Sequence, residues 1–114
     1  MNAEELKSRT KQYAISIARF SQRLPDNPIN RVYKSQLIRS SSSVGANYRA
    51  ARRAKSKPDF INKLKIVEEE LDESMFFLEL LEPFNQDLRH EIQTMHQEAE
   101  TILKIIVATI VSSR

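Results

Sequence analysis

The sequence predicts an all-α protein, an antiparallel up-down-up-down four-helix bundle formed by a single domain over residues 1–114. Three observations lead to this prediction. A chain of 114 residues has the length of about one domain. One Gly and four Pro are too few turn-forming residues for a many-stranded sheet or a glycine-rich phosphate loop. The prolines also divide the chain into four segments, and each segment has apolar residues spaced three and four apart, as in a helix.

The first helix is predicted over residues 3–24. It ends at Leu24 because the residue before a proline disfavours helical geometry, and Asp26 and Asn27 suit a turn between Pro25 and Pro28. Its buried stripe is expected to contain Leu6, Thr10, Tyr13, Ile17, Phe20 and Leu24.

The second helix is predicted over residues 29–54. Its stripe contains Tyr33, Leu37, Ser40, Val44, Asn47 or Tyr48, Ala51 and Ala54. The middle of the stripe, Ser40 to Gly45, consists of mediocre helix formers, so a loop is an alternative there. We favour a helix because the stripe continues in phase on both sides, and the small side chains would let a neighbouring helix approach closely.

The third helix is predicted over residues 58–82, where Ser56 can cap the first turn and Asp59 occupies the acidic position of a capping box. Its stripe contains Phe60, Leu64, Val67, Leu71, Ser74, Phe77 or Leu78, and Leu81. The fourth helix is predicted over residues 86–112, starting near Asn85 or Asp87. Its stripe contains Leu88, Ile92, Met95, Ala99, Ile102, Ile106 and Thr109 or Ile110.

The end of the fourth helix is apolar on nearly every side. A small bundle leaves one side of each helix facing outward, so this excess is expected to contact another copy of the chain. The expected interface residues are Leu103, Ile105, Val107 and Val111. The alternative is a last helix with a few exposed aliphatic side chains.

Charge is segregated along the chain. Ten basic residues and one acid lie between Arg31 and Lys65, whereas eleven acids and one Arg lie between Glu68 and Glu100. At about 100° per residue, the cations of the second helix fall opposite its apolar stripe. The candidates for contacts with nucleic-acid phosphates are Arg31, Lys34, Arg49, Arg52, Arg53, Lys55 and Lys57. The alternative is an ordinary solvated face.

The acidic run is expected to form ion pairs, within the bundle or between subunits. The residues expected in such pairs are Arg39, Glu70, Asp72 and Glu73. A di-metal bundle centre would need two Glu-x-x-His motifs, and neither His90 nor His96 completes one.

The composition excludes several other kinds of site. With no Cys the chain has neither a disulfide nor a thiolate nucleophile, and we find no nucleophile and base pattern. We therefore expect no catalytic residues, no metal, no cofactor, no small-molecule substrate and no membrane span. We expect a cytoplasmic location, because a chain without Cys is typical of a reducing compartment.

The stretch from Arg39 to Leu81 resembles the 23S rRNA intervening sequence protein family, whose members are often called four helix bundle proteins. The resemblance is greatest from Leu37 to Asn47, and again from Asp59 to Leu64 and at Glu70 and Asp72-Glu73-Ser74. It implies a bacterial cytoplasmic bundle assembled as a homopentamer.

The resemblance also implies a connection with RNA. Some members are encoded within insertions in large-subunit rRNA genes, and others resemble the accessory protein of diversity-generating retroelements, which binds RNA and a reverse transcriptase. This chain has Ala50 and Ala51 where relatives usually carry a Glu, and Lys55 where many carry an acid. Phe76 and Phe77 replace a Tyr-Trp pair. The first two changes favour an anionic partner.

Two functions remain open at this point. The first is an oligomeric RNA-binding or ribonucleoprotein-accessory protein without enzymatic activity. The second is a self-assembling structural or adaptor protein that has no nucleic-acid partner and pairs basic with acidic faces of neighbouring copies.

Overall fold

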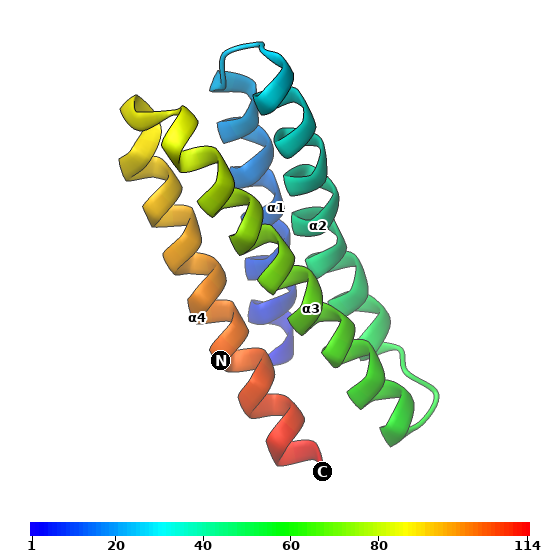
Figure 1. Ribbon diagram of the computed structural model, residues 1–114. Coiled ribbons are helices and arrows are strands. Elements are labelled where there is room, and N and C mark those ends of the chain that lie inside the picture. Colours follow the sequence, from blue (N-terminus) through cyan, green and yellow to red (C-terminus); the bar gives the residue numbers. More distant parts are fainter.

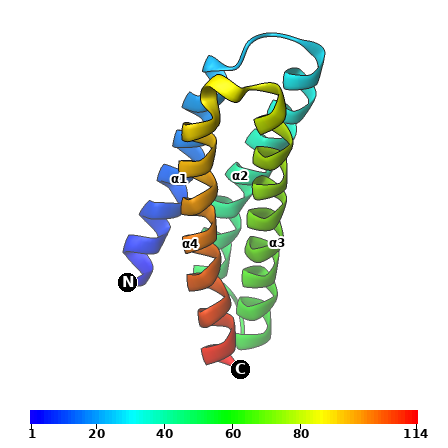
Figure 2. The ribbon, with the colours of Figure 1, turned by 60° about the vertical axis from the view of Figure 1, so that its left-hand side comes forward.

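The structure, a computed structural model, describes residues 1–114 and contains four long helices in an antiparallel bundle (Figure 1). The helices are α1 (Ala3–Arg23), α2 (Pro28–Arg52), α3 (Lys57–Leu81) and α4 (Arg89–Ser113). The α1–α2 and α3–α4 connections lie at one end of the bundle and the α2–α3 connection at the other (Figures 1 and 2). The molecule measures 45 × 21 × 19 Å. The predicted all-α, up-down-up-down bundle is confirmed.

Three of the four helices begin with a side-chain cap. Asn2, Asn27 and Ser56 each accept a hydrogen bond from a backbone N–H three residues further on. At the start of α3 the Ser56 hydroxyl accepts from the N–H of Asp59 at 3.2 Å, and Pro58 lies in the first turn. The start that the sequence predicted for the third helix is therefore correct to within one residue.

The segment Ser40–Gly45 is helical, so α2 runs without a break through the stretch that could have been a loop. Ser40 and Ser41 are fully buried, and their hydroxyl groups donate to carbonyl oxygens of α2 itself, at 2.9 and 3.2 Å. Gly45 faces α1, where a Cβ added to it would lie 3.6 Å from the backbone carbonyl of Thr10. The small side chains therefore allow α1 and α2 to pack closely.

The fourth helix begins at Arg89, later than the predicted start at residue 86. Two short 3-10 turns, η1 (Glu82–Phe84) and η2 (Gln86–Leu88), separate it from α3. Between the turns, Asn85 has φ −145° and ψ 58°, and its buried side chain donates to the Leu81 carbonyl at 2.9 Å. The predicted start near Asn85 or Asp87 is wrong because the Asn85 side chain makes a tertiary contact and does not cap the helix.

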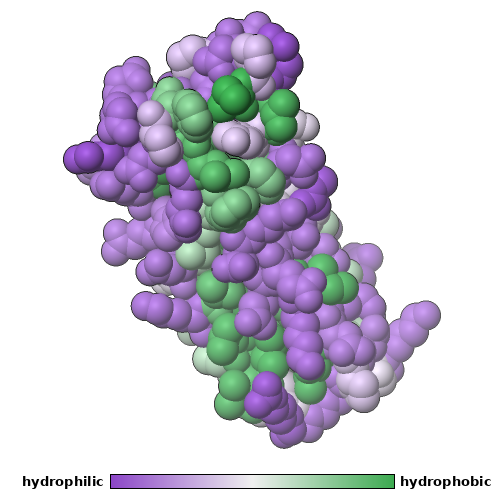
Figure 3. Space-filling model, in the orientation of Figure 1, coloured by the Kyte–Doolittle hydropathy of each residue, from purple (hydrophilic) through white to green (hydrophobic).

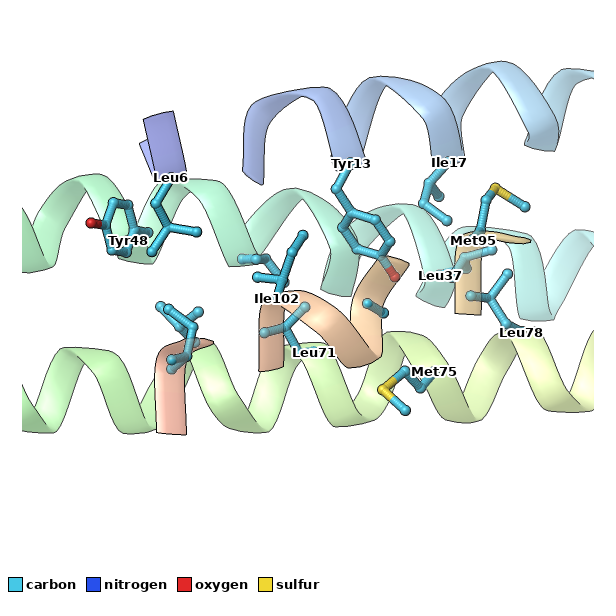
Figure 4. Packing of buried hydrophobic residues seen from close by; sticks show 14 of the residues in the cluster. Leu6, Tyr13, Ile17, Leu37, Tyr48, Leu71, Met75, Leu78, Met95 and Ile102 are labelled. Carbon is cyan, nitrogen blue, oxygen red and sulfur yellow. The ribbon is translucent and has the colours of Figure 1, made fainter. Parts of the chain in front are cut away.

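A single cluster of 21 buried hydrophobic residues from all four helices forms the core (Figure 4). The α1 stripe is buried as predicted, including its polar member Thr10. The Tyr13 ring extends from α1 into the middle of the bundle (Figure 4), and its hydroxyl lies 2.7 Å from Ser74 Oγ of α3. The core thus runs along the long axis and leaves the outer helix faces and both ends for other contacts.

Candidate nucleic-acid interface

Five of the predicted phosphate-binding cations gather at the end of the bundle where the chain turns from α2 into α3. Arg49 and Arg52 lie in the last turn of α2, and Arg53 is its C-cap. Lys55 lies in the connection, and Lys57 is the first residue of α3. All five are exposed. We call these five residues the basic corner.

The charge of the basic corner is not neutralised within the chain, because none of its cations lies within 4.0 Å of a carboxylate oxygen. The acid nearest to the corner in sequence is Asp59, which accepts from Lys63 Nζ at 2.6 Å and from the backbone N–H of Lys55 at 3.1 Å. These hydrogen bonds, that of Lys63 first, lower the pKa of Asp59. The Arg52 guanidinium lies 5.8 Å from the centre of the Phe60 ring. The corner therefore presents concentrated positive charge to solvent.

The other two predicted phosphate-binding residues do not join this group. Arg31 lies in the first turn of α2, about 27 Å along the helix from Arg49 at 1.5 Å per residue. Its guanidinium donates to Asp26 at 2.9 Å. Lys34 is partly buried, because it lies three residues before the buried Leu37 at the edge of the apolar stripe. Five of the seven predicted phosphate-binding residues thus lie together in the basic corner, and the other two lie apart from it.

Arg39, midway along α2, contacts α3 of the same chain. Its guanidinium donates to Glu70 at 3.1 Å and also to Glu73. The pKa of Arg39 is raised, chiefly by the hydrogen bond to Glu73. Asp72, the remaining residue of the predicted ion-pair group, is exposed and has no ion-pair partner in the chain. Arg39 is therefore held by α3 and stays apart from the basic corner.

The residues predicted to form an oligomer interface lie at the end of α4. Leu103 and Ile105 are partly buried against the core, whereas Val107 and Val111 have 38% and 56% of their surface exposed. An apolar area covers this end of α4 in Figure 3. In the single chain, two of the four predicted interface side chains thus face solvent.

The histidines lie at the surface or its rim. His96 Nε2 lies 2.8 Å from a carboxylate oxygen of Glu79, and His90 is exposed. No group of three or more His, Cys, Asp or Glu side chains is placed to hold a metal ion. None of the helices combines the length and apolar character needed to cross a membrane.

Several polar contacts between distant segments were not predicted from the sequence, among them Arg9–Glu98 and Asn30–Asn85. Arg9 of α1 donates two hydrogen bonds to Glu98 of α4, both at 2.7 Å. Asn30 and Asn85 bond to each other in the interior. A signal existed only for the first contact, since Arg9 and Glu98 each precede a residue of a predicted buried stripe.

The fold and the surface define a small antiparallel four-helix bundle that carries a cluster of five exposed cations at one end. Residues 4–108 match the family model of the 23S rRNA-intervening sequence protein, and the chain belongs to that family. The match extends well beyond the stretch from Arg39 to Leu81 that showed the resemblance.

One similar solved structure is a protein of unknown function from the S23 ribosomal protein family of Bacteroides thetaiotaomicron VPI-5482. The two chains share 31% sequence identity and superpose with a TM-score of 0.88, over 96% of this chain and 98% of that one. No curated protein matches the chain.

Proposed function

We propose that this protein is a non-enzymatic RNA-binding protein whose basic corner holds the phosphate backbone of structured RNA. The observation that supports the proposal is the set of five exposed cations without a carboxylate partner. Bringing such cations together costs free energy through mutual repulsion, and an anionic ligand removes that cost. A polyphosphate backbone is the ligand that matches several cations at once.

Contacts of this kind position RNA without reading its sequence. Flexible Arg and Lys side chains on the end of a bundle can follow the phosphates of a helix or loop, so recognition depends on RNA shape. The family description names an rRNA insertion, which is consistent with an RNA ligand.

We further propose that the protein acts as a homo-oligomer, with the apolar end of α4 in the interface. A ring of five copies is the arrangement that the family resemblance implies. Several copies would present several basic corners to one RNA, and linked sites bind far more tightly than one. A reverse transcriptase or another ribonucleoprotein component is the protein partner that the same resemblance suggests.

The test is a triple variant, R49Q/R52Q/R53Q, compared with a matched variant, K11Q/R19Q/R89Q. The second variant removes the same charge at exposed positions without ion pairs away from the basic corner. Binding to structured RNA is measured by fluorescence anisotropy across a range of salt concentrations. Each lost phosphate contact should flatten the slope of log affinity against log salt by about 0.7 to 0.9, so the first variant should lose about two to three units. The matched variant should lose little.

The stability of the first variant should fall by only about 1–2 kcal/mol, because these side chains interact with the C-terminal end of α2 and one stacks on Phe60. Binding is therefore compared at a temperature at which both variants are folded. No salt-sensitive binding by the wild type would refute the proposal. Dissociation of the oligomer in the first variant alone would instead favour the adaptor function, in which the corner contacts acids of a neighbouring copy.

A further inference from the structure

Four aromatic rings form a continuous cluster across α2, α3 and η1. The ring centres of Phe76 and Phe77 are 5.6 Å apart, those of Phe77 and Tyr33 6.2 Å, and those of Tyr33 and Phe84 6.4 Å. The two outer members, Phe76 and Phe84, have 52% and 57% of their surface exposed. Apolar surface is visible over this half of α2 and α3 in Figure 3. Two large rings in water contribute little to the core.

Phe76 lies on the outer face of α3, surrounded by carboxylates. Asp72 and Glu73 are one turn before it and Glu79 one turn after it, whereas the core residues of α3 point to the opposite side. A surface hollow of about 520 Å³ lies here, and Phe76 is the one hydrophobic residue that lines it. Glu69, Asp72 and Glu79 lie around the ring.

The charge of this face is only partly balanced within the chain. Arg39 binds Glu70 and Glu73, and Glu79 contacts His96, but Glu69 and Asp72 have no ion-pair partner. We propose that this acidic aromatic surface, Phe76 and Phe84 with the carboxylates of Glu69, Asp72 and Glu79, binds a cationic amphipathic segment of a partner protein. Apolar side chains of that segment cover the rings, and its Lys or Arg residues meet the carboxylates.

The sign of the charge excludes RNA, because phosphates are repelled by carboxylates. The basic corner of a second copy has the right charge but lacks apolar contact area, since no large hydrophobic side chain from residue 49 to residue 65 is exposed. A partner with both cations and apolar side chains fits the surface better than either.

The probe is a fluorescent synthetic helix of Lys and Leu, with Leu on one face, added to the full-length protein. A peptide of the same composition with Leu scattered around the helix is the control ligand. The F76Q variant should weaken binding of the amphipathic peptide by about tenfold. The D72N/E79Q variant should weaken binding and flatten its salt dependence. V32Q, a change at a comparably exposed apolar position of α2 outside this surface, should leave affinity unchanged.

Both Phe76 and Phe84 are on the surface, so F84Q serves as a second variant if F76Q alters the circular dichroism spectrum. Equal binding of the two peptides, or unchanged affinity in both Phe variants, would overturn the proposal. An oligomer mass that falls in F76Q would overturn it too, by assigning the surface to a contact between copies. The RNA affinity of F76Q should equal that of the wild type, so this result is independent of the basic corner.

Discussion

Asn30 of α2 and Asn85 of the α3–α4 connection, 55 residues apart, hold each other by two reciprocal hydrogen bonds of 3.0 and 2.9 Å. Both side chains are buried. The remaining amide hydrogens donate to the carbonyl oxygens of Pro25 and Leu81, each at 2.9 Å. This pair joins the two connections at one end of the bundle and satisfies every polar atom of both side chains.

We predict that N30A and N85A each lower the free energy of unfolding by about 1–3 kcal/mol, because each leaves buried polar atoms of its partner unpaired. The double variant should cost less than the sum of the two, with a coupling of about 0.5–3 kcal/mol. Urea denaturation followed by circular dichroism measures all three. N62A, at an exposed position, is the control and should change stability by less than about 0.5 kcal/mol. Additive effects would show that the pair does not act as a unit.

Gly45 gives a second prediction, in which the sign depends on the size of the new side chain. G45A should stabilise the protein by about 0.5–1 kcal/mol, because Gly is costly inside a helix and a Cβ would meet Thr10 at an ordinary 3.6 Å. G45L should instead destabilise it by about 1–3 kcal/mol, because the longer side chain has to displace α1. Thermal melting of the two variants distinguishes the effects. A destabilising G45A would mean that the two helices are closer than the structure shows.

The buried Tyr13 predicts how stability changes at alkaline pH. Burial raises its pKa to about 12, against 10.0 when unperturbed. Between these values the unfolded chain loses the proton while the folded chain keeps it, so the stabilisation present below pH 10 is lost as pH rises toward 12. Y13F removes this effect, at the cost of the hydrogen bond to Ser74, about 1 kcal/mol.

The wild type should therefore be the more stable protein near neutral pH, and its advantage should shrink and reverse toward pH 12. Denaturant unfolding at several alkaline pH values gives the free energy of unfolding of each protein. The titration of Lys and the other Tyr residues affects both proteins equally, so it cancels in the difference between them. A constant difference across this range would contradict the raised pKa.

The apolar end of α4 predicts the behaviour of the oligomer. V107E/V111E should reduce the mass measured by light scattering at micromolar concentration while helicity is retained, because these side chains are exposed in the single chain and their burial in an interface would desolvate two charges. V32E, at an exposed apolar position of α2, is the control. A wild-type mass equal to one chain would refute the homo-oligomer. An unchanged mass in the double variant would place the interface elsewhere.

The helices and core could be predicted because they depend on local periodicity. Leu37 and Val44 are in phase on either side of the serines, so a regular helix is the simplest path between them, and both are fully buried. The start of α4 could not be predicted in this way. The conformation of Asn85 depends on its hydrogen bond with Asn30, and the two residues come together only when α2 and α3 have packed.

The candidate interface was predictable only in part, for a similar reason. The five cations of the basic corner are close in sequence and stay close in space where the chain reverses between α2 and α3. Arg31 is separated from them by most of the length of α2. Whether Arg39 meets solvent or an acid depends on the register between α2 and α3, which the spacing within one helix does not contain. The sequence places carboxylates four and three residues before Phe76 and three residues after it. It does not show that the Phe76 side chain is exposed to solvent.

The separation of the basic corner from the acids of α3 and α4 has a kinetic consequence. Opposite charges at different heights along a bundle 45 Å long give the molecule an electric dipole, although its net charge is only +3. In the field of a polyanion such a molecule turns before contact, so most encounters begin at the basic corner. Association should therefore slow as salt is added, while the lifetime of the complex changes much less.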